Sequence, residues 1–287
     1  MDRLRKIFTI LMILTGITCE AAEMKKIILI VVDGMRPDGM ISCGHPLIGQ
    51  LKKHSFYTFR GRTVFPSVTL PCHLSLFHSV PPEIHGTIDN KFVLPPLPGA
   101  GEVMKKQGKE VMFFYNWAEL RDLARPDSLK RSVLISSHDY GGKAAAQMIT
   151  DEVIRVLKKE QPDFIFLHLD QPDGVGHEHY WMTEEYLQAL RDCFDCIGRI
   201  IPVLPEDYLL VLLSDHGGHR GRHGTELPED MTIPVFFYHS SLVSRELPGA
   251  NIIDVMPTAL VATGMEPDRA WQGKVLFQTI NHKEKEK

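Results

Sequence analysis

The sequence predicts an α/β fold, a three-layer α/β/α sandwich built around a mainly parallel sheet. Short runs of consecutive apolar, often β-branched residues recur along the chain, which is typical of strands buried on both faces. Amphipathic stretches of helical length lie between them, and strands that alternate with helices form parallel sheets covered on both faces. The strand runs cover residues 25–32, 110–115, 164–169, 208–213 and 233–238, and the helical stretches cover 143–159, 183–201 and 252–263.

Polar residues follow three of these strands directly. The first strand ends at Asp33-Gly34, and Asp173 and Asp215 follow the strands at 164–169 and 208–213 by a few residues. Ligands collect outside the carboxyl ends of the strands in such a sheet, so we expect the three carboxylates to share one crevice. Three histidines and a threonine stand in similar segments, and the whole set comprises Asp33, Thr69, Asp173, His177, Asp215, His216 and His223.

This combination of side chains indicates metal chemistry. Three carboxylates, three imidazoles and one hydroxyl suit two transition-metal ions. Two such ions held close together activate a nucleophile and clamp a phosphoryl group during in-line displacement. The sequence therefore predicts a hydrolase.

A short helix is predicted between the first and second apolar runs, starting near Pro71. Proline is favoured in the first turn because its missing N–H would have no partner there. The free N–H groups and positive dipole end of this helix would favour an alkoxide on Thr69 and a phosphate oxygen. The competing interpretation is that Thr69 only caps the helix. Asn116 and Trp117 follow the strand at 110–115, so they are candidates for substrate contacts or for a structural turn.

The sequences of five segments resemble motifs of the alkaline phosphatase superfamily, most closely those of its type I phosphodiesterase and nucleotide pyrophosphatase branch. The resemblance runs from about Lys26 to Gly264 and rests on VVDGMRPD, FPSVTLPCH, DQPDGVGHEH, LLSDHGG and GRHGT. It implies that Thr69 is the nucleophile and that two zinc ions are bound, with Mn²⁺ or another divalent transition metal as the alternative. The implied ligands are Asp173, His177 and His223 for one ion, and Asp33, Asp215, His216 and the Thr69 oxygen for the other.

Two features depart from the pattern of that family. Cys72 stands where the family usually has an asparagine that donates to a phosphate oxygen, and a thiol is a poor donor. Cys72 is therefore a candidate substrate contact that would donate only a weak hydrogen bond. His223 follows His216 after only seven positions, whereas larger members carry a long insertion there. We expect a minimal version of the fold with a more open pocket.

Residues 22–287 are predicted to form a single catalytic domain. The chain is 287 residues long with 44% hydrophobic residues, which suffices for one large core, and no linker divides it. The net charge of -4, without a basic stripe interleaved with aromatic residues, argues against a dedicated nucleic-acid-binding surface. The four cysteines beyond residue 21 are too few for a disulfide scaffold, and we expect Cys193 and Cys196, which lie in a helical stretch, to be core-facing thiols. The oligomeric state is left open.

The N-terminus predicts a secretory signal peptide over residues 1–21. A basic start precedes an apolar run at 7–18, which is too short to span a bilayer, and small residues follow it. Cleavage after Ala21 would release a secreted or periplasmic protein without a transmembrane span. The alternatives are a lipoprotein anchored through Cys19 and a cytoplasmic protein with an apolar start.

Together these features predict a secreted dizinc phosphodiesterase or nucleotide pyrophosphatase. It would hydrolyse phosphodiester or pyrophosphate bonds of a small phosphodiester or nucleotide through a phosphothreonine intermediate. The alternatives within the superfamily are a phosphomonoesterase, for which the arginine beside the nucleophile is missing, and a phosphotransferase. The alternative from another class is a non-catalytic metal-binding protein, which would be expected to have lost some ligands. The preferred leaving group stays open.

Overall fold

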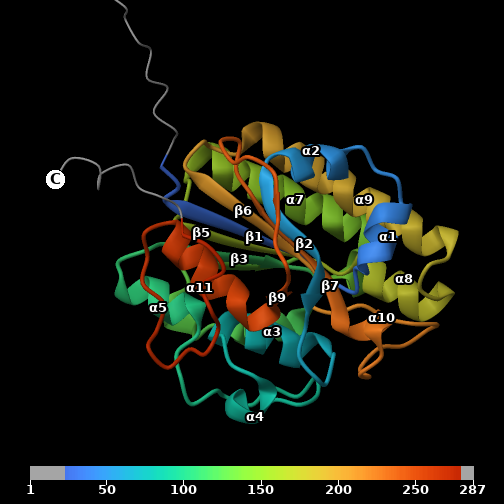
Figure 1. Ribbon diagram of the computed structural model, residues 1–287, viewed down its shortest axis with the longest axis horizontal. Helices are drawn as coiled ribbons and strands as arrows, with labels where there is room; N and C mark the ends of the chain where they lie inside the picture. Colours follow the sequence, from blue (N-terminus) through green and yellow to red (C-terminus); the bar gives the residue numbers. More distant parts are fainter. Residues whose placement is uncertain (1–22, 279–287) are drawn as a thin grey trace, which may run out of the picture.

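The computed structural model describes residues 23–278, and it confirms the α/β prediction (Figure 1). Within that range a nine-stranded sheet has the order β4-β3-β5-β1-β6-β7-β2-β8, with β9 paired to β2. The strands are β1 (Lys26–Val32), β2 (Ser55–Arg62), β3 (Val111–Tyr115), β4 (Arg131–Leu134), β5 (Phe164–Leu169), β6 (Tyr208–Leu213), β7 (Thr232–Tyr238), β8 (Arg245–Glu246) and β9 (Ala250–Asn251).

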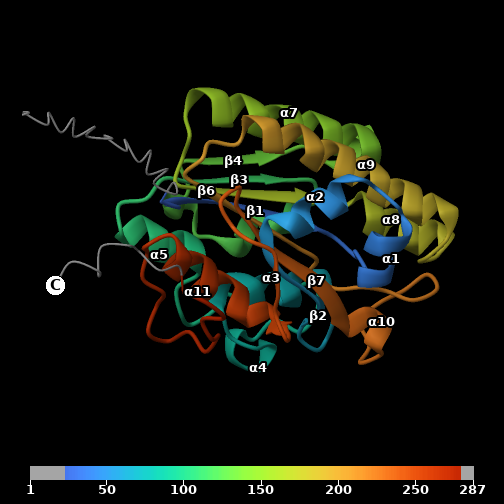
Figure 2. The same cartoon turned by 45° about the horizontal axis from the view of Figure 1, so that its top comes forward.

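The helices form the two outer layers (Figure 2). The larger helices are α3 (Thr69–His78), α5 (Ala100–Lys106), α7 (Gly142–Lys159), α8 (Gln171–His179), α9 (Glu184–Ile200) and α11 (Ile252–Ala262). Shorter ones are α1 (Pro37–Ser42), α2 (Leu47–Lys53), α4 (Pro82–His85), α6 (Ser137–Tyr140) and α10 (Pro228–Met231), with 3₁₀ turns at Ala118–Leu123, Pro126–Ser128 and Ile201–Val203.

The central strand β1 shows why both faces of the sheet are covered. Alternate side chains of a strand point to opposite faces. Ile27, Leu29 and Val31 join one core with residues of α3, α5 and α11, while Ile28 and Ile30 join a second core with residues of α1, α2, α7 and α9. A strand with two buried faces needs an unbroken apolar sequence, which is what the sequence of β1 predicts.

Most of the sheet is parallel, as predicted, but β7 runs antiparallel to both β6 and β2. The predicted runs do not include β2, β4 or the two-residue strands β8 and β9. The sequence of β4 alternates between half-buried and exposed residues at the edge of the sheet, and β2 contains several polar residues. Neither strand therefore has the continuous apolar run that marks a central strand.

The register of the parallel strands determines where the polar residues that follow them lie. Val32 of β1 lies beside Leu169 of β5, and Val31 lies beside Leu213 of β6. The backbone N–H of Asp33 continues the ladder by donating to the Leu169 carbonyl at 2.9 Å. All three strands therefore end at one edge of the sheet.

Cys43, Cys72, Cys193 and Cys196 are buried and free, which confirms the expectation of core-facing thiols for Cys193 and Cys196. In the same range, we find no helix with the length and apolar character that crossing a bilayer requires. The predicted signal peptide at 1–21 and the alternative anchor at Cys19 lie outside the described residues.

Candidate active site

Four of the predicted residues meet where β1 and β6 end and α3 begins. Nε2 of His216 lies 3.1 Å from Thr69 Oγ1, 3.3 Å from Asp33 Oδ1 and 3.4 Å from Asp215 Oδ2. All four side chains are buried. We call Asp33, Thr69, Asp215 and His216 the buried half of the site.

The buried half contains two carboxylate oxygens without hydrogen-bond partners among the described residues, Asp33 Oδ1 and Asp215 Oδ2. The second oxygen of each carboxylate is occupied. Oδ2 of Asp33 lies 3.1 Å from His168 Nε2, and Oδ1 of Asp215 accepts the Gly34 N–H at 3.3 Å. Buried carboxylate oxygens that face each other are costly unless a cation neutralises them. The donor set of the buried half therefore fits a metal ion.

The pKa values of the metal-free protein also reflect the free-energy cost of burying these carboxylates. Burial raises the pKa of Asp33 well above its ordinary value, and the carboxylates of Asp215 and Asp173 raise it further. Burial also raises the pKa of Asp215. Burial lowers the pKa of His216 to about 3, so its imidazole is neutral at physiological pH. A neutral imidazole is the form that ligates a metal ion.

The other predicted ligands form a more open group, which we call the open half of the site. Asp173 and His177 lie on α8, and His223 lies on the loop between β6 and α10. Nε2 of His177 lies 3.4 Å from Asp173 Oδ2, and Nε2 of His223 lies 3.7 Å from Asp173 Oδ1. Asp173 Oδ1 is also without a hydrogen-bond partner among the described residues. The open half thus fits a metal ion as well.

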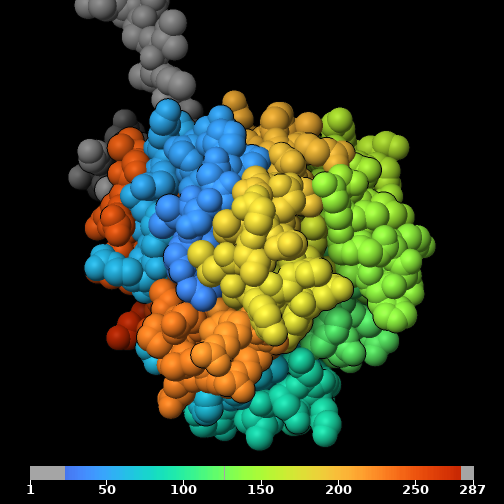
Figure 3. Space-filling view, turned by 90° about the vertical axis from the view of Figure 1, so that its right-hand side faces the viewer, coloured from blue at the N-terminus to red at the C-terminus, as the bar shows by residue number. Residues whose placement is uncertain are grey.

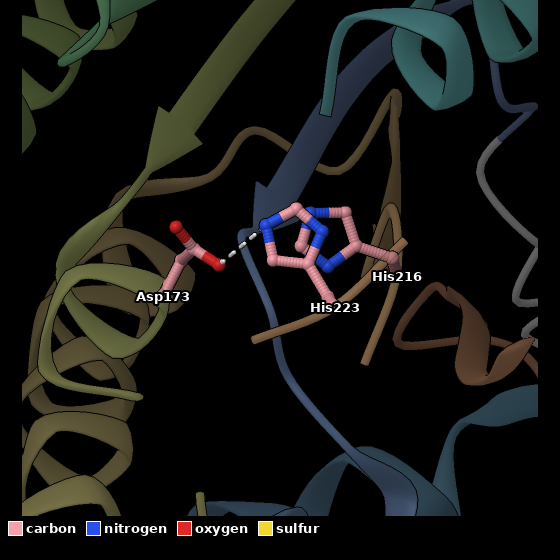
Figure 4. A group of neighbouring side chains, drawn as sticks. All are labelled: Asp173, His216 and His223. Carbon is pink, nitrogen blue, oxygen red and sulfur yellow. Dashed lines mark ion pairs between the residues drawn. The ribbon is translucent and has the colours of Figure 1, made fainter. Parts of the chain in front are cut away.

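The two halves touch through a pair of stacked imidazoles. The rings of His216 and His223 lie 3.9 Å apart at an angle of 16° (Figure 4). Two sets of possible ligand atoms lie within 4.8 Å of one another. One set belongs to Asp33, Asp215 and His216, and the other belongs to Asp173, His223 and again His216. His177 belongs to neither group, although it lies beside Asp173. His216 therefore stands between the two candidate metal positions.

Each histidine of the two halves has its Nδ1 atom next to a backbone carbonyl. A carbonyl oxygen only accepts, so Nδ1 carries the hydrogen and Nε2 keeps its lone pair for a metal. All three rings are thus oriented by the backbone. The contacts join His216 to Gly217 O at 2.8 Å, His223 to Ser67 O at 2.8 Å and His177 to Gly221 O at 3.0 Å.

A cavity of about 490 Å³ opens over both halves. Figure 3 shows the face on which α8, the loop that carries His223 and the segment after α4 lie next to one another. The cavity is lined by Asp33, Thr69, Asp173, His177 and His223 of the predicted set, and by Asn90, Trp117, Ser137, His138, Gly142, Lys143, Asp170, Gln171, Gly174, Val175 and Glu178.

Of the three predicted substrate contacts, only Trp117 lines this cavity. Cys72 is fully buried in the core beneath α3, where its sulfur accepts a hydrogen bond from Thr63 Oγ1 at 3.1 Å. Asn116 is also buried, and its amide donates to the Ile135 carbonyl at 2.8 Å. Both side chains point into the protein, so the structure does not support their predicted role.

The start of α3 agrees with the predicted helix start near Pro71, but it contradicts the competing cap interpretation and the expected free N–H groups. Val68 is the N-cap and Thr69 the first helical residue, so Thr69 does not cap the helix. The expected free N–H groups are also scarce, because Pro71 has none and the Cys72 N–H donates to Val68 O. The Leu70 N–H donates to Asn90 Oδ1 at 3.1 Å.

Sequence reasoning missed three residues around the site. Asn90 lies in a segment without regular structure, where an asparagine normally indicates a turn. Asp170 follows β5 directly, as Asp33 follows β1, and this position could have identified it. Burial raises the pKa of Asp170 to about 6, although a hydrogen bond from Ser137 opposes the shift. His168 lies inside β5, where no periodic signal marks it.

The family of the chain follows from its sequence. The profile described as "Type I phosphodiesterase / nucleotide pyrophosphatase" matches residues 27–121 and 102–231, which is more than half of the chain. The chain belongs to this family. The resemblance inferred from the five motifs is thereby confirmed.

Relatives of this phosphodiesterase family chain differ in length and activity. Human ectonucleotide pyrophosphatase/phosphodiesterase family member 1 is 29% identical over 218 residues, covering 68% of this chain and 24% of that protein. The chain therefore spans about a quarter of that relative. A 2,3-bisphosphoglycerate-independent phosphoglycerate mutase of Clostridium novyi is 26% identical over 199 residues, covering 62% of this chain and 39% of the mutase.

Solved structures share the fold at low identity. An inactive variant of murine ectonucleotide pyrophosphatase/phosphodiesterase 5, in complex with AMP, superposes with a TM-score of 0.69 at 13% identity, covering 84% of this chain and 95% of that one. The phosphonate monoester hydrolase of Agrobacterium radiobacter gives 0.69 at 15% identity, covering 88% and 76%. This phosphodiesterase family chain thus has the architecture of the alkaline phosphatase superfamily.

Proposed function

We propose that the chain is a dizinc phosphodiesterase that cleaves phosphodiester or pyrophosphate bonds with Thr69 as nucleophile. The observation that carries the proposal is the convergence of four atoms in the buried half. The Thr69 hydroxyl and two unpartnered carboxylate oxygens all lie within 3.4 Å of the His216 lone pair. A hydroxyl that only stabilised the helix would have no reason to meet this set.

Each half of the site would hold one zinc ion, with Mn²⁺ as an alternative. Imidazole and carboxylate ligands favour transition metals over magnesium and calcium. When bound, the two ions would lower the pKa of the Thr69 hydroxyl and neutralise charge on the phosphoryl group. The residues that would hold them are Asp33, Thr69, Asp215 and His216 in the buried half, and Asp173, His177 and His223 in the open half.

The reaction proceeds in two displacements. Thr69 Oγ1 forms a bond to phosphorus while the bond from phosphorus to the leaving oxygen breaks, and the leaving group departs with a proton. Water then attacks the phosphorus of the threonine phosphodiester, and the departing Thr69 oxygen takes up a proton, which releases a phosphomonoester and restores the hydroxyl. Asn90 would donate to a phosphate oxygen, because its Oδ1 is held by the Leu70 N–H and its amide NH₂ remains for the cavity.

Charge favours a diester over a monoester. Two divalent ions would bring four positive charges against the three carboxylates of Asp33, Asp173 and Asp215. The remaining positive charge is matched by the Thr69 alkoxide, and Asp170 places a further carboxylate in the cavity. A monoanionic diester is therefore accommodated more easily than a dianionic monoester.

The substrate we propose is a small phosphodiester or a nucleotide. The human relative is a nucleotide pyrophosphatase by name, and the murine structure contains AMP. Trp117 in the cavity would offer an aromatic surface to a nucleobase. The match to phosphoglycerate mutases favours phosphotransfer from Thr69 to an alcohol as the second candidate. Secretion remains part of the proposal and depends on residues 1–21.

A substrate panel tests this function. Zinc-loaded protein is assayed with bis-nitrophenyl phosphate, nitrophenyl phosphate, a nucleotide nitrophenyl ester and a dinucleoside polyphosphate. We expect kcat/KM for the diester to exceed that for the monoester by roughly tenfold or more, because close charges of equal sign cost on the order of 1 kcal/mol even in water. A preference for the monoester would favour a phosphomonoesterase, and glycerol phosphate formed in added glycerol would favour a phosphotransferase.

A further inference from the structure

A histidine lies inside the otherwise apolar strand β5. The sequence of β5 is FIFLHL, and all six residues are buried. His168 takes the place beside Val31 of β1 and faces the same core as Phe164 and Phe166. An imidazole at this position replaces an apolar side chain that would fit the core without any polar atom to satisfy.

His168 has a single hydrogen-bond partner among the described residues. Its Nε2 lies 3.1 Å from Asp33 Oδ2, and its Nδ1 is buried without a partner. As a metal ligand Asp33 would be ionised and could only accept, so the ring hydrogen of His168 would sit on Nε2 and be donated to Asp33. The unpartnered Nδ1 costs free energy, which means that this imidazole destabilises the core locally. Its position therefore requires a reason other than stability.

Within residues 23–278, no other side chain donates a hydrogen bond to Oδ2 of Asp33. The neighbouring imidazole of His73 uses its Nδ1 to donate to the Thr69 carbonyl at 2.8 Å. The Gly34 N–H donates to Asp215. Oδ1 of Asp33 is left free and faces His216 Nε2 at 3.3 Å.

We propose that His168 is a positioning residue, whose Nε2–H fixes Asp33 so that Oδ1 faces the metal position of the buried half. The inference rests on the proposed function, because it treats Asp33 as a metal ligand. Hydrogen bonds from such supporting residues orient the ligands and change metal affinity, typically by 10- to 100-fold. His168 does not contact the substrate and takes no part in the chemical steps.

Zinc binding by the full chain tests the inference without turnover. The variants are His168→Leu, which removes the donor, and His168→Gln, whose amide can donate from a place close to Nε2. The matched control is His239→Leu. His239 is also buried, but it contacts Glu206 O and Ser241 at the opposite end of β6 from the site. Zinc affinity is measured by competition with a chromophoric chelator, and thermal stability is recorded in parallel.

We expect His168→Leu to weaken the tighter zinc site roughly 10- to 100-fold, and His168→Gln to recover part of the loss. The control should keep the affinity of the wild type whatever its stability. Wild-type affinity in His168→Leu would overturn the positioning role while leaving the proposed function intact.

A wild-type chain that binds no zinc would overturn the proposed function together with this inference. If the leucine variant does not fold, His168→Asn replaces it. The asparagine side chain is shorter, and its amide lies near the place of the wild-type Nδ1 atom, away from Asp33. The His168→Asn variant should therefore bind zinc more weakly than the His168→Gln variant. Equal affinities of the two amide variants would contradict the inference.

Discussion

The two halves of the candidate site are built in different ways. The buried half comes from the ends of neighbouring strands, where the register of the sheet determines each backbone position. The open half joins a helix, α8, to a loop, and the His177 side chain is 44% exposed. One oxygen of Asp33 and one of Asp215 lie next to donors outside the ligand set, His168 and the Gly34 N–H, whereas the imidazoles next to Asp173 are the predicted ligands His177 and His223 themselves.

The difference separates two requirements of a dinuclear site. A position formed by strand ends is preorganised, because moving a ligand would require moving the sheet. A position formed by a helix and a loop can open, which allows substrate to enter and product to leave. We therefore expect the buried half to bind metal more tightly and the open half to govern exchange. The following predictions test this contrast, beginning with the largest effect.

Thr69→Ala should lower kcat by at least about a thousandfold, because it removes the attacking oxygen from the buried half and leaves only activated water. Thr69→Ser should keep measurable activity because it retains the hydroxyl. Rapid acid quench followed by peptide mass mapping should find a phosphate or a phosphoryl ester adduct on the peptide that contains Thr69. Inversion at phosphorus with a chiral phosphorothioate substrate would contradict the covalent step, and retention would support it.

If the proposed function is right, chelator titration should release two zinc ions in separate steps. We expect the open half to release its zinc at chelator concentrations roughly tenfold lower or more, since its ligands are more exposed and less supported. His177→Ala should shift the first release step to still lower chelator concentrations and leave the second step unchanged. Release of both ions in one step, or a change in the second step, would mean that the halves are not independent.

The loop that carries His223 is held by one buried carboxylate, Asp230. Its Oδ1 accepts from His219 Nδ1 at 2.7 Å, and its Oδ2 accepts from the Thr225 N–H at 2.9 Å and from the Thr225 hydroxyl at 2.7 Å. The Gly217 N–H also donates to the Asp230 backbone carbonyl at 2.8 Å. The rigidity of the open half thus depends on this loop anchor.

Asp230→Asn should weaken zinc in the open half by roughly tenfold, because the amide places a donor where two donors already point. The matched control is Asp254→Asn, which removes a buried carboxylate that caps α11 and accepts from the N–H groups of Asn251 and Lys274. Both variants should lose stability, but only Asp230→Asn should change the first step of the chelator titration. Equal titration curves would mean that the loop does not need its anchor.

How far the sequence predicts the site follows from the same contrast. Asp33 and Asp215 could be placed together from sequence because parallel strands end at one edge of the sheet. Trp117 was placed correctly at the cavity, whereas the side chain of its neighbour Asn116 turns into the protein. Two adjacent residues on an irregular segment have no fixed alternation, so only packing decides which one faces the cavity.

Residues that act through other residues were beyond the reach of the sequence pattern. His168 is a polar residue in an apolar run, and Asp230 lies in a four-residue helix, five positions beyond the end of the GRHGT motif. Their roles depend on contacts across 135 and 11 positions of the chain, respectively. Cys72 was expected at the phosphate because of its place in a motif, but the α3 face on which it lies packs on the core.

The smallest expected effect concerns Asp170, the N-cap of α8 next to the open half. Its side chain makes no cap hydrogen bond and accepts from Ser137 Oγ instead. Its folded pKa of about 6 lies above the ordinary value of 3.8, so the folded state holds a proton that the unfolded state has lost. Stability from this group is fully present below about pH 4 and is lost as the pH rises through about 6.

Asp170→Asn removes this titration. As the pH rises from 4 to 7, the free energy of unfolding of the metal-free variant should therefore increase relative to that of the wild type. The change should be on the order of 2 kcal/mol or less, since one pKa unit corresponds to about 1.4 kcal/mol and the group is partly solvated. Urea unfolding of chelator-treated protein at several pH values measures it. Ser137→Ala should steepen the loss in the wild-type background, because the hydroxyl stabilises the ionised carboxylate. If the stability difference between wild type and Asp170→Asn does not change with pH, another group causes the pH dependence. Asp170 would then add no titrating charge next to the open half.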